Sequence, residues 1–168
     1  DMGPLVNSQG QKRMIDIVSD AVAKGAKIET GGKVPKGFNK GYWFEPTVLS
    51  NVTSDMLAYQ KETFGPIAPF FKFETEEEAL KLANDTEYGL ASYLFTEDVE
   101  RQARFAKELQ FGEVQINGVK YAIYLPHGGI KNSGIGHDCS VLALDDYLIK
   151  KRVTTSCLLY TSDAADER

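Results

Sequence analysis

The feature that most constrains this chain is a regular alternation of strand-like and helix-like segments between residues 68 and 116. Short apolar runs with strand character occupy Ala68–Phe73, Ala91–Phe95 and Gly112–Ile116. Between them lie two helical patterns, the first opened by the capping box Thr75-Glu76-Glu77-Glu78 and the second capped by Asp98. The second helix should turn an apolar stripe inward, formed by Val99, Ala103, Ala106 and Leu109. Because strands that alternate with helices usually pair in parallel under right-handed crossovers, the pattern predicts an α/β fold with a parallel sheet.

The first sixty residues add a second group of elements. A helix is predicted from Ser8, its cap, to Lys24, and a short strand over Lys27–Thr30. Tyr42–Leu49 is strand-like, although its internal proline limits it to an edge or an irregular stretch. Ser54–Gln60 is long enough for one or two helical turns. The apolar positions that should face the core from the first helix are Met14, Ile17, Val18, Ala21 and Val22.

Charge and composition exclude several classes of function. The net charge is −5, so no basic face is evident for a nucleic acid. No run of eighteen apolar residues is present, which argues against a membrane span. The two cysteines, Cys139 and Cys157, cannot build a disulfide framework. A reducing compartment fits that count best, and we predict a cytoplasmic location.

Both ends of the chain are expected to be set by the reading frame of the source DNA. Residues 157–168 resemble the translation of a sequencing-library adapter, although a natural extension is the alternative. If they are not native, Cys139 is the only native cysteine. The predicted organisation is therefore a domain over 1–144, a strand segment over 145–156 and a non-native tail over 157–168.

Generic motifs for chemistry are weak. Gly128–Gly134 resembles a phosphate-binding loop in composition only, since it lacks the Gly-Lys-Ser/Thr ending. His127 and His137 lack the spacing of metal ligands, so no metal is predicted. Cys139 with these histidines allows a Cys–His nucleophile, against the alternative of an inert thiol.

One short segment, Glu62-Thr63-Phe64-Gly65-Pro66, stands out before a predicted strand. An acidic residue, an aromatic residue and a Gly-Pro turn together can present two side chains rigidly to a ligand. The alternative is a surface carboxylate and a core phenylalanine that happen to be joined by a turn. The pattern alone leaves both interpretations open.

Six sequence blocks, taken in order, closely resemble the C-terminal third of the NAD(P)-dependent aldehyde dehydrogenase superfamily, over nearly all of residues 1–155. The blocks are Asp1–Val6, Gly25–Lys27 with Thr30–Gly32, Gly41–Leu49, Glu62–Pro66, Leu82–Ser92 and Gly129–Gly136. The resemblance implies a partial three-layer α/β fold, a sheet with helices on its faces, belonging to the catalytic domain of that family.

The resemblance also implies a reaction. Members of the family oxidise an aldehyde to a carboxylic acid with NAD or NADP: a cysteine thiolate attacks the aldehyde, hydride leaves for the nicotinamide, and water activated by a glutamate releases the acid from the thioester. By its place in the motif, Glu62 would accept hydrogen bonds from the ribose hydroxyls of the cofactor. Phe64 would pack beside the nicotinamide.

The long loop over residues 118–137 matches the segment of the family that faces the substrate. His127 stands where the family usually has phenylalanine, which implies a more polar aldehyde pocket. Tyr121, Ile123 and Tyr124 would line or support the same pocket, or else pack in the core. Lys61 stands where many members of the family have a second acidic residue, a difference that affects only the local charge. Neither the particular aldehyde nor the choice between NAD and NADP follows from these residues.

Two family motifs are not in this sequence: the Gly-Gln-x-Cys setting of the nucleophile and the Glu-Leu-Gly-Gly-Lys stretch that carries the general base. Cys139 has a different setting and should not inherit the catalytic role, so the chain by itself is expected to be inactive. Tyr147–Thr155 matches the strand that joins a neighbouring subunit, which implies a homo-oligomer. The alternatives are a free-standing interaction module of the same fold and a small Cys–His hydrolase.

Overall fold

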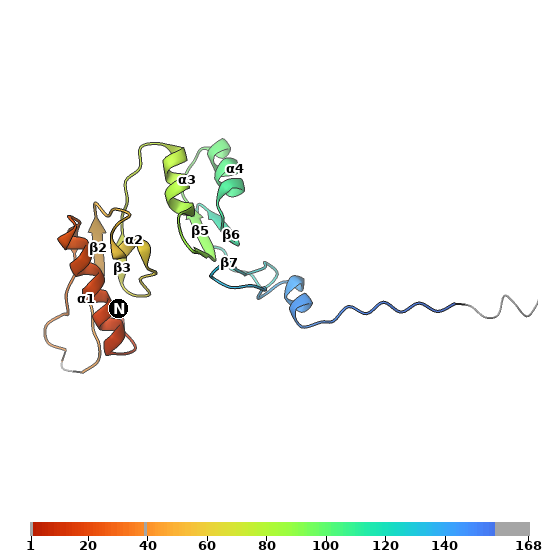
Figure 1. The fold of residues 1–168 in the computed structure, drawn as a ribbon, viewed down its shortest axis with the longest axis horizontal. Helices are drawn as coiled ribbons and strands as arrows, with labels where there is room; N and C mark the ends of the chain where they lie inside the picture. Colours follow the sequence, from red (N-terminus) through yellow and green to blue (C-terminus); the bar gives the residue numbers. More distant parts are fainter. Residues whose placement is uncertain (1, 39, 157–168) are drawn as a thin grey trace, which may run out of the picture. The chain divides into compact units, whose positions relative to one another are not determined.

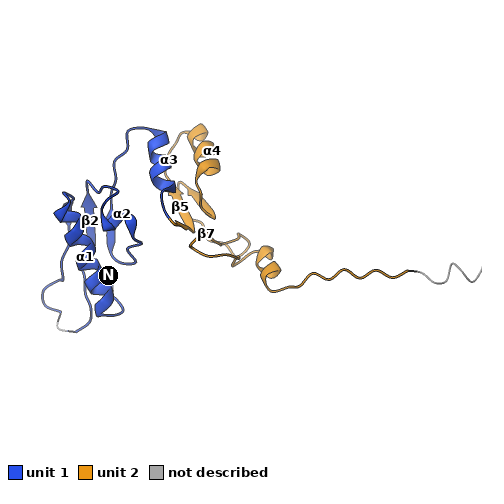
Figure 2. Ribbon diagram, viewed as in Figure 1, with its two compact units in different colours: residues 1–86 blue, residues 87–168 orange. Residues whose placement is uncertain are grey.

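The computed structural model describes residues 2–38 and 40–156 (Figure 1). The predicted non-native tail and Cys157 lie outside the described residues. The chain divides into two compact units, Asp1–Thr86 and Glu87–Arg168 (Figure 2). No helix within the described residues is long and apolar enough to cross a membrane.

Unit 1 begins with helix α1, Ser8–Ala23. Its cap is Asn7 and not the predicted Ser8, because the Asn7 side-chain oxygen accepts a hydrogen bond from the Gly10 N–H at 2.9 Å. The buried stripe is as predicted except for Val22, which is 45% exposed. It consists of Met14, Ile17, Val18 and Ala21.

The sheet of unit 1 has the order β1-β2-β3, with strands Lys27–Thr30, Thr47–Ser50 and Ile67–Pro69. β1 pairs antiparallel with β2, and β2 pairs parallel with β3. Of the strand-like stretch predicted over Tyr42–Leu49, only the part after Pro46 forms a strand, and the residues before it are irregular, because proline has no N–H to donate to the ladder. The strand is not at an edge, since β2 lies between β1 and β3. Leu49 of β2 and Met14 of α1 are fully buried in the core of this unit.

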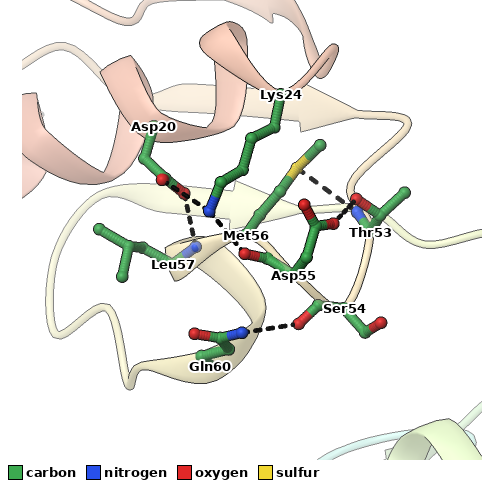
Figure 3. Close-up of polar contacts among 8 residues, drawn as sticks. All are labelled: Asp20, Lys24, Thr53, Ser54, Asp55, Met56, Leu57 and Gln60. Atoms are coloured by element: carbon green, nitrogen blue, oxygen red, sulfur yellow. Dashed lines mark hydrogen bonds and ion pairs between the residues drawn. The ribbon is translucent and has the colours of Figure 1, made fainter.

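A four-residue helix, α2 (Leu57–Gln60), is held against α1 by polar contacts (Figure 3). Its own cap residue, Met56, makes no side-chain cap, and the Leu57 N–H instead donates to Asp20 of α1 at 2.7 Å. Lys24 donates to the Asp55 carbonyl at 2.6 Å and pairs with Asp20 at 2.8 Å. The Leu57 hydrogen bond and then the Lys24 contact lower the pKa of Asp20. A remote carboxylate therefore caps the helix that leads into Glu62.

Helix α3, Glu76–Asn84, begins with the predicted cap. Thr75 accepts from the Glu78 N–H at 3.2 Å, while the Glu78 carboxylate accepts from the N–H of Glu74, one residue before the position that a capping box predicts. The buried strand predicted over Ala68–Phe73 was only partly right. The strand ends at Pro69, and Phe70 and Phe73 are more than half exposed.

Unit 2 contains a strand–helix–strand unit: β5 (Ala91–Leu94), α4 (Val99–Glu108) and β6 (Glu113–Ile116), with β5 and β6 parallel. Asp98 caps α4 by accepting from the Arg101 N–H at 3.0 Å, as predicted. The predicted inner face of α4 was right for Leu109, which is buried, but wrong for Val99, Ala103 and Ala106, which are exposed. The buried side chains are Phe105 and Leu109, an i, i+4 pair with more apolar area than the alanines.

Two further short strands pair antiparallel in unit 2, β4 (Tyr88–Gly89) and β7 (Ile130–Lys131). β7 lies inside the loop predicted over residues 118–137. A 3₁₀ helix, η1, spans Val141–Asp146. Residues 148–156 are exposed and carry no helix or strand.

The α/β class and the parallel pairing of β5 with β6 are confirmed, but the three predicted strands do not form one sheet. Among the described residues, β3 pairs with β2, whereas β5 pairs with β6. Strand pairing depends on contacts between distant residues, which an alternating pattern does not specify.

Candidate functional site

In unit 1, the candidate site is the turn Glu62–Gly65, which follows α2 and precedes β3. Glu62 is exposed, and no hydrogen bond or ion pair joins its carboxylate to another described residue. Phe64 is 74% exposed and has a backbone φ of +45°, in the left-handed region that non-glycine residues rarely adopt. The interpretation of Phe64 as a core residue is therefore wrong, and both side chains are available to a ligand.

Gly65 explains how the turn keeps this shape. A Cβ on Gly65 would overlap the sulfur of Met14 and would lie 3.0 Å from its terminal methyl carbon. Since Met14 is fully buried, the backbone at Gly65 rests directly on the core. Close backbone contact at Gly65 and the left-handed φ of Phe64 together turn the phenylalanine ring outward. Left-handed strain of this kind is often found at functional sites.

In unit 2, a cavity of about 840 Å³ opens beside β6 and the loop that follows it. Its lining includes Glu113, Gln115, Tyr121, Ile123, His127 and Cys139. The loop predicted to face the substrate forms a wall of a cavity, and three of the four residues predicted to line or support that pocket, Tyr121, Ile123 and His127, lie on it.

His127 is held at both its backbone and its ring. Its N–H donates to the Asp138 carbonyl at 2.8 Å, and its carbonyl accepts from the Asp138 N–H at 2.7 Å. The ring Nδ1 lies 2.9 Å from a carboxylate oxygen of Glu113. The Tyr121 ring meets the imidazole edge-on, with centroids 6.3 Å apart.

The two predicted tyrosines have different positions. Interaction with the Tyr121 hydroxyl, followed by desolvation, raises the pKa of Tyr93 on β5. Tyr124 is exposed and does not line the cavity. Its ring instead faces the Lys120 ammonium, 6.0 Å from the centroid.

Sequence reasoning missed Glu113, the partner of His127. One signal was present: Glu113 and Gln115 are two residues apart in a predicted strand, so both point to the same face. Two polar side chains on one face of an otherwise apolar strand indicate a polar wall. No local pattern indicated that His127, fourteen residues later, would complete this polar wall.

The structure gives little support to a metal site, a Cys–His nucleophile or a phosphate-binding loop. Across residues 2–38 and 40–156, no three His, Cys, Asp or Glu side chains gather to hold a metal ion. Cys139 is exposed on the cavity wall, and within that same part of the chain its thiol has no hydrogen bond to either histidine. Gly128 and Gly129 lie close to the backbone of neighbouring loop residues, which explains the glycines by packing.

The sequence model of the aldehyde dehydrogenase family matches residues 1–153. The chain belongs to the aldehyde dehydrogenase family. The match includes both the Glu62 turn and the wall of the unit 2 cavity.

Relatives within the family are much longer than this chain. The peroxisomal aminoaldehyde dehydrogenase 1 of Pisum sativum is 44% identical over 163 residues, which are 96% of this chain and 32% of the relative. The mitochondrial succinate-semialdehyde dehydrogenase of Mus musculus is 46% identical over 90% of this chain and 29% of its own length. The chain thus spans about a third of the curated relatives it matches.

Solved aldehyde dehydrogenase structures share the fold. Succinate-semialdehyde dehydrogenase from Burkholderia pseudomallei superposes with a TM-score of 0.82 at 46% identity, over 87% of this chain and 30% of that one. A 3,6-anhydro-L-galactose dehydrogenase, solved in complex with NAP, gives a TM-score of 0.85 at 42% identity over 90% and 32%. Betaine aldehyde dehydrogenase from Staphylococcus aureus, solved with NAD+, gives 0.85 at 37% identity over 96% and 34%. The chain therefore has the α/β architecture of part of the aldehyde dehydrogenase catalytic domain.

Proposed function

We propose that this chain is the C-terminal part of an enzyme that oxidises an aldehyde to a carboxylic acid with NAD+ or NADP+. The family match over residues 1–153 carries the proposal. Relatives named as succinate-semialdehyde and aminoaldehyde dehydrogenases support the reaction class. In the balanced reaction, aldehyde, water and NAD(P)+ give acid, NAD(P)H and a proton.

On the cofactor side, Glu62 accepts hydrogen bonds from the ribose hydroxyls, and Phe64 packs beside the nicotinamide. The geometry of the turn fits this role. The Glu62 carboxylate is exposed and has no competing partner among the described residues, so it can accept from two hydroxyls. Phe64 already has its ring in solvent, where a flat heterocycle can stack. The bound cofactor supplies the hydride acceptor.

On the substrate side, His127 and Tyr121 form the wall against which the aldehyde binds, while Tyr124 supports the loop from outside through Lys120. The His127–Glu113 pair makes this wall polar, as expected from a histidine at a position where the family usually has phenylalanine. The cysteine nucleophile and the general base come from a segment outside this sequence.

Residues Tyr147–Thr155 pair with the sheet of a second subunit in this proposal. All of these residues are exposed. Ile149 and Val153 are exposed apolar residues four positions apart, so in an extended strand they would lie on the same face. A stand-alone interaction module would use the same segment, so oligomerisation by itself does not separate the two functions.

Location remains a prediction from the cysteine count. Relatives are named as peroxisomal and mitochondrial enzymes. The cytoplasmic location proposed for this chain does not come from these relatives and rests on the cysteine count alone.

The decisive experiment is a chimera. Residues 1–153 replace the matching part of the Burkholderia pseudomallei succinate-semialdehyde dehydrogenase, and NAD(P)H formation is followed at 340 nm with a panel of aldehydes. We expect activity in the chimera and none in the 168-residue chain. A chimera that assembles and binds NAD(P)+ yet oxidises no aldehyde contradicts the proposal, as does aldehyde-dependent NAD(P)H formation by the chain alone.

The role of Glu62 is tested in the same chimera. A hydrogen bond to a charged group contributes roughly 1.5–3 kcal/mol, so Glu62→Gln should raise the KM for NAD(P)+ by about tenfold or more. Glu77→Gln is the matched control, since Glu77 is also an exposed carboxylate of unit 1 but lies on α3. Equal KM values for the two variants would exclude Glu62 from the cofactor site.

A further inference from the structure

We propose that Glu113 is the positioning residue of His127: it holds the proton of the neutral imidazole on Nδ1 and leaves Nε2 as a hydrogen-bond acceptor for whatever occupies the cavity. The role of this histidine in binding the aldehyde substrate rests on the proposed function. The pairing itself does not, because it concerns only side chains of this chain.

The first observation is the contact between the two side chains. Nδ1 of His127 lies 2.9 Å from Oε2 of Glu113. The Glu113 side chain is 18% exposed and that of His127 35%, so the pair is partly shielded from water. An ionised carboxylate can only accept hydrogen bonds, so the ring nitrogen that faces it must carry the hydrogen. In other proteins, a carboxylate that accepts from one ring nitrogen of a functional histidine sets the tautomer of that histidine in the same way.

The second observation is that Glu113 is itself fixed. Its other oxygen, Oε1, accepts a hydrogen bond from the Gln115 side-chain amide. The side-chain oxygen of Gln115, Oε1, in turn accepts a hydrogen bond from the Lys120 backbone N–H at 2.5 Å. Gln115 is buried, which limits its freedom to move. The carboxylate is therefore held at both oxygens and is tied through Gln115 to the beginning of the cavity loop.

The third observation is a close backbone approach beside the pair. A Cβ on Gly112 would overlap the carbonyl oxygen of Gly128. Gly112 directly precedes Glu113, and Gly128 directly follows His127. The absence of a side chain at Gly112 lets β6 and the loop come close enough for the carboxylate and the imidazole to meet. The two hydrogen bonds between His127 and Asp138 then fix the loop backbone on its other side.

These contacts leave the Nε2 atom as the functional end of the ring. No hydrogen bond joins Nε2 to another residue in the described part of the chain. His127 lines the cavity, so its remaining nitrogen is the polar atom that the histidine offers there. With the hydrogen held on Nδ1, a neutral His127 accepts a hydrogen bond and does not donate one. A ligand at this wall must then bring an O–H or N–H group.

The test is direct observation of the tautomer by NMR. Long-range ¹H–¹⁵N correlation spectra of the ¹⁵N-labelled 168-residue chain are recorded at alkaline pH, where imidazole is neutral. The chain has two histidines, so His137 serves as the internal reference. We expect a pyrrole-type shift at Nδ1 and a pyridine-type shift at Nε2 for His127. A wild-type His127 with the hydrogen on Nε2 overturns the proposal.

Variants then assign the effect to Glu113. Glu113→Gln should abolish the preference, because an amide can donate to Nδ1 as well as accept from it. Glu113→Asp keeps the charge and should restore most of the Nδ1–H form. Glu97→Gln, an exposed acid in the same unit, should change nothing.

An unchanged His127 tautomer in Glu113→Gln would refute the assignment. If that variant fails to fold, the wild-type spectrum still decides the matter, since it reports the position of the hydrogen without any substitution. None of these readouts depends on aldehyde oxidation. A failed chimera with a confirmed tautomer would therefore reject the proposed function and leave the Glu113–His127 pairing standing.

Discussion

Replacing Gly65 with alanine tests how the Glu62–Gly65 turn is built. The added Cβ would overlap the Met14 sulfur and would lie 3.0 Å from its methyl carbon and 3.3 Å from its Cγ. Carbon atoms in good contact are separated by roughly 3.5–4.0 Å. Met14 is fully buried and has no solvent to move into, so either its rotamer or the turn must shift. Overpacking of this kind costs about 1–3 kcal/mol.

The assay is urea unfolding of the 168-residue chain followed by Trp43 fluorescence. Trp43 is the single tryptophan and lies in unit 1, so it reports on the unit that contains the substitution. At an m-value of about 1–3 kcal/mol/M, the unfolding midpoint of Gly65→Ala should fall by on the order of 1 M. Gly3→Ala is the control, because a Cβ on Gly3 would meet nothing within 4 Å. Its midpoint should stay close to that of the wild type.

A double-mutant cycle separates the steric mechanism from a general weakening of the turn. Met14→Ala alone should cost about 2–5 kcal/mol through the cavity it leaves. In the double variant the new methyl group enters space that Met14 has vacated, so the total loss should fall short of the sum by roughly 0.5–3 kcal/mol. Additive losses, or a Gly65→Ala variant as stable as the wild type, would refute the packing argument.

Two further predictions concern pH. The pKa of Asp20 is lowered from its ordinary value of 3.8, first by the hydrogen bond from the Leu57 N–H and then by Lys24. The ionised Asp20 carboxylate therefore stabilises the fold above about pH 3.8, and this stabilisation is lost as the pH falls through the pKa of Asp20 in the folded state. Asp20→Asn keeps an acceptor for Leu57 but no ionisable group, and the stability difference between wild type and variant should shrink as urea titrations move from pH 6 to pH 2; a constant difference would contradict the linkage. Burial, followed by the hydrogen bond to Asp85, raises the pKa of Tyr59 to about 12. Tyr59 therefore stabilises the fold below pH 10 and loses this effect as the pH rises towards 12, so the advantage of wild type over Tyr59→Phe should decline across that range, and a pH-independent advantage would exclude the raised pKa.

Local signals predicted most of the elements. Strand β1 has the predicted bounds, and α3 ends at the predicted residue, Asn84. The Asp98 cap was also right, because the preference of short polar side chains for caps depends on a few neighbouring backbone groups. The turn at Glu62–Gly65 was predicted for the same reason, since its Gly-Pro pair and its position before a strand are local features, whereas its role in cofactor binding comes from the family resemblance and stays a proposal.

Features that depend on distant residues could not be predicted in this way. Three of the four inward positions of α4 were assigned wrongly because an amphipathic pattern of ten residues allows more than one apolar stripe, and the packing of Phe105 selects between them. The parallel pairing of β2 with β3, and not of β3 with β5, depends on contacts between segments that are separate in sequence.

By itself, the amino-acid sequence determined the class of fold, the caps of α3 and α4, and the residues that carry the family resemblance, since each of these is encoded over a few neighbouring positions. Tertiary structure alone decided that Phe64 faces solvent, that Gly65 rests on Met14, and that Glu113 meets His127. Each of these depends on a close approach between backbone segments that are far apart in the chain. Such an approach is set by which groups fit against one another in the folded protein, and no short stretch of sequence records it.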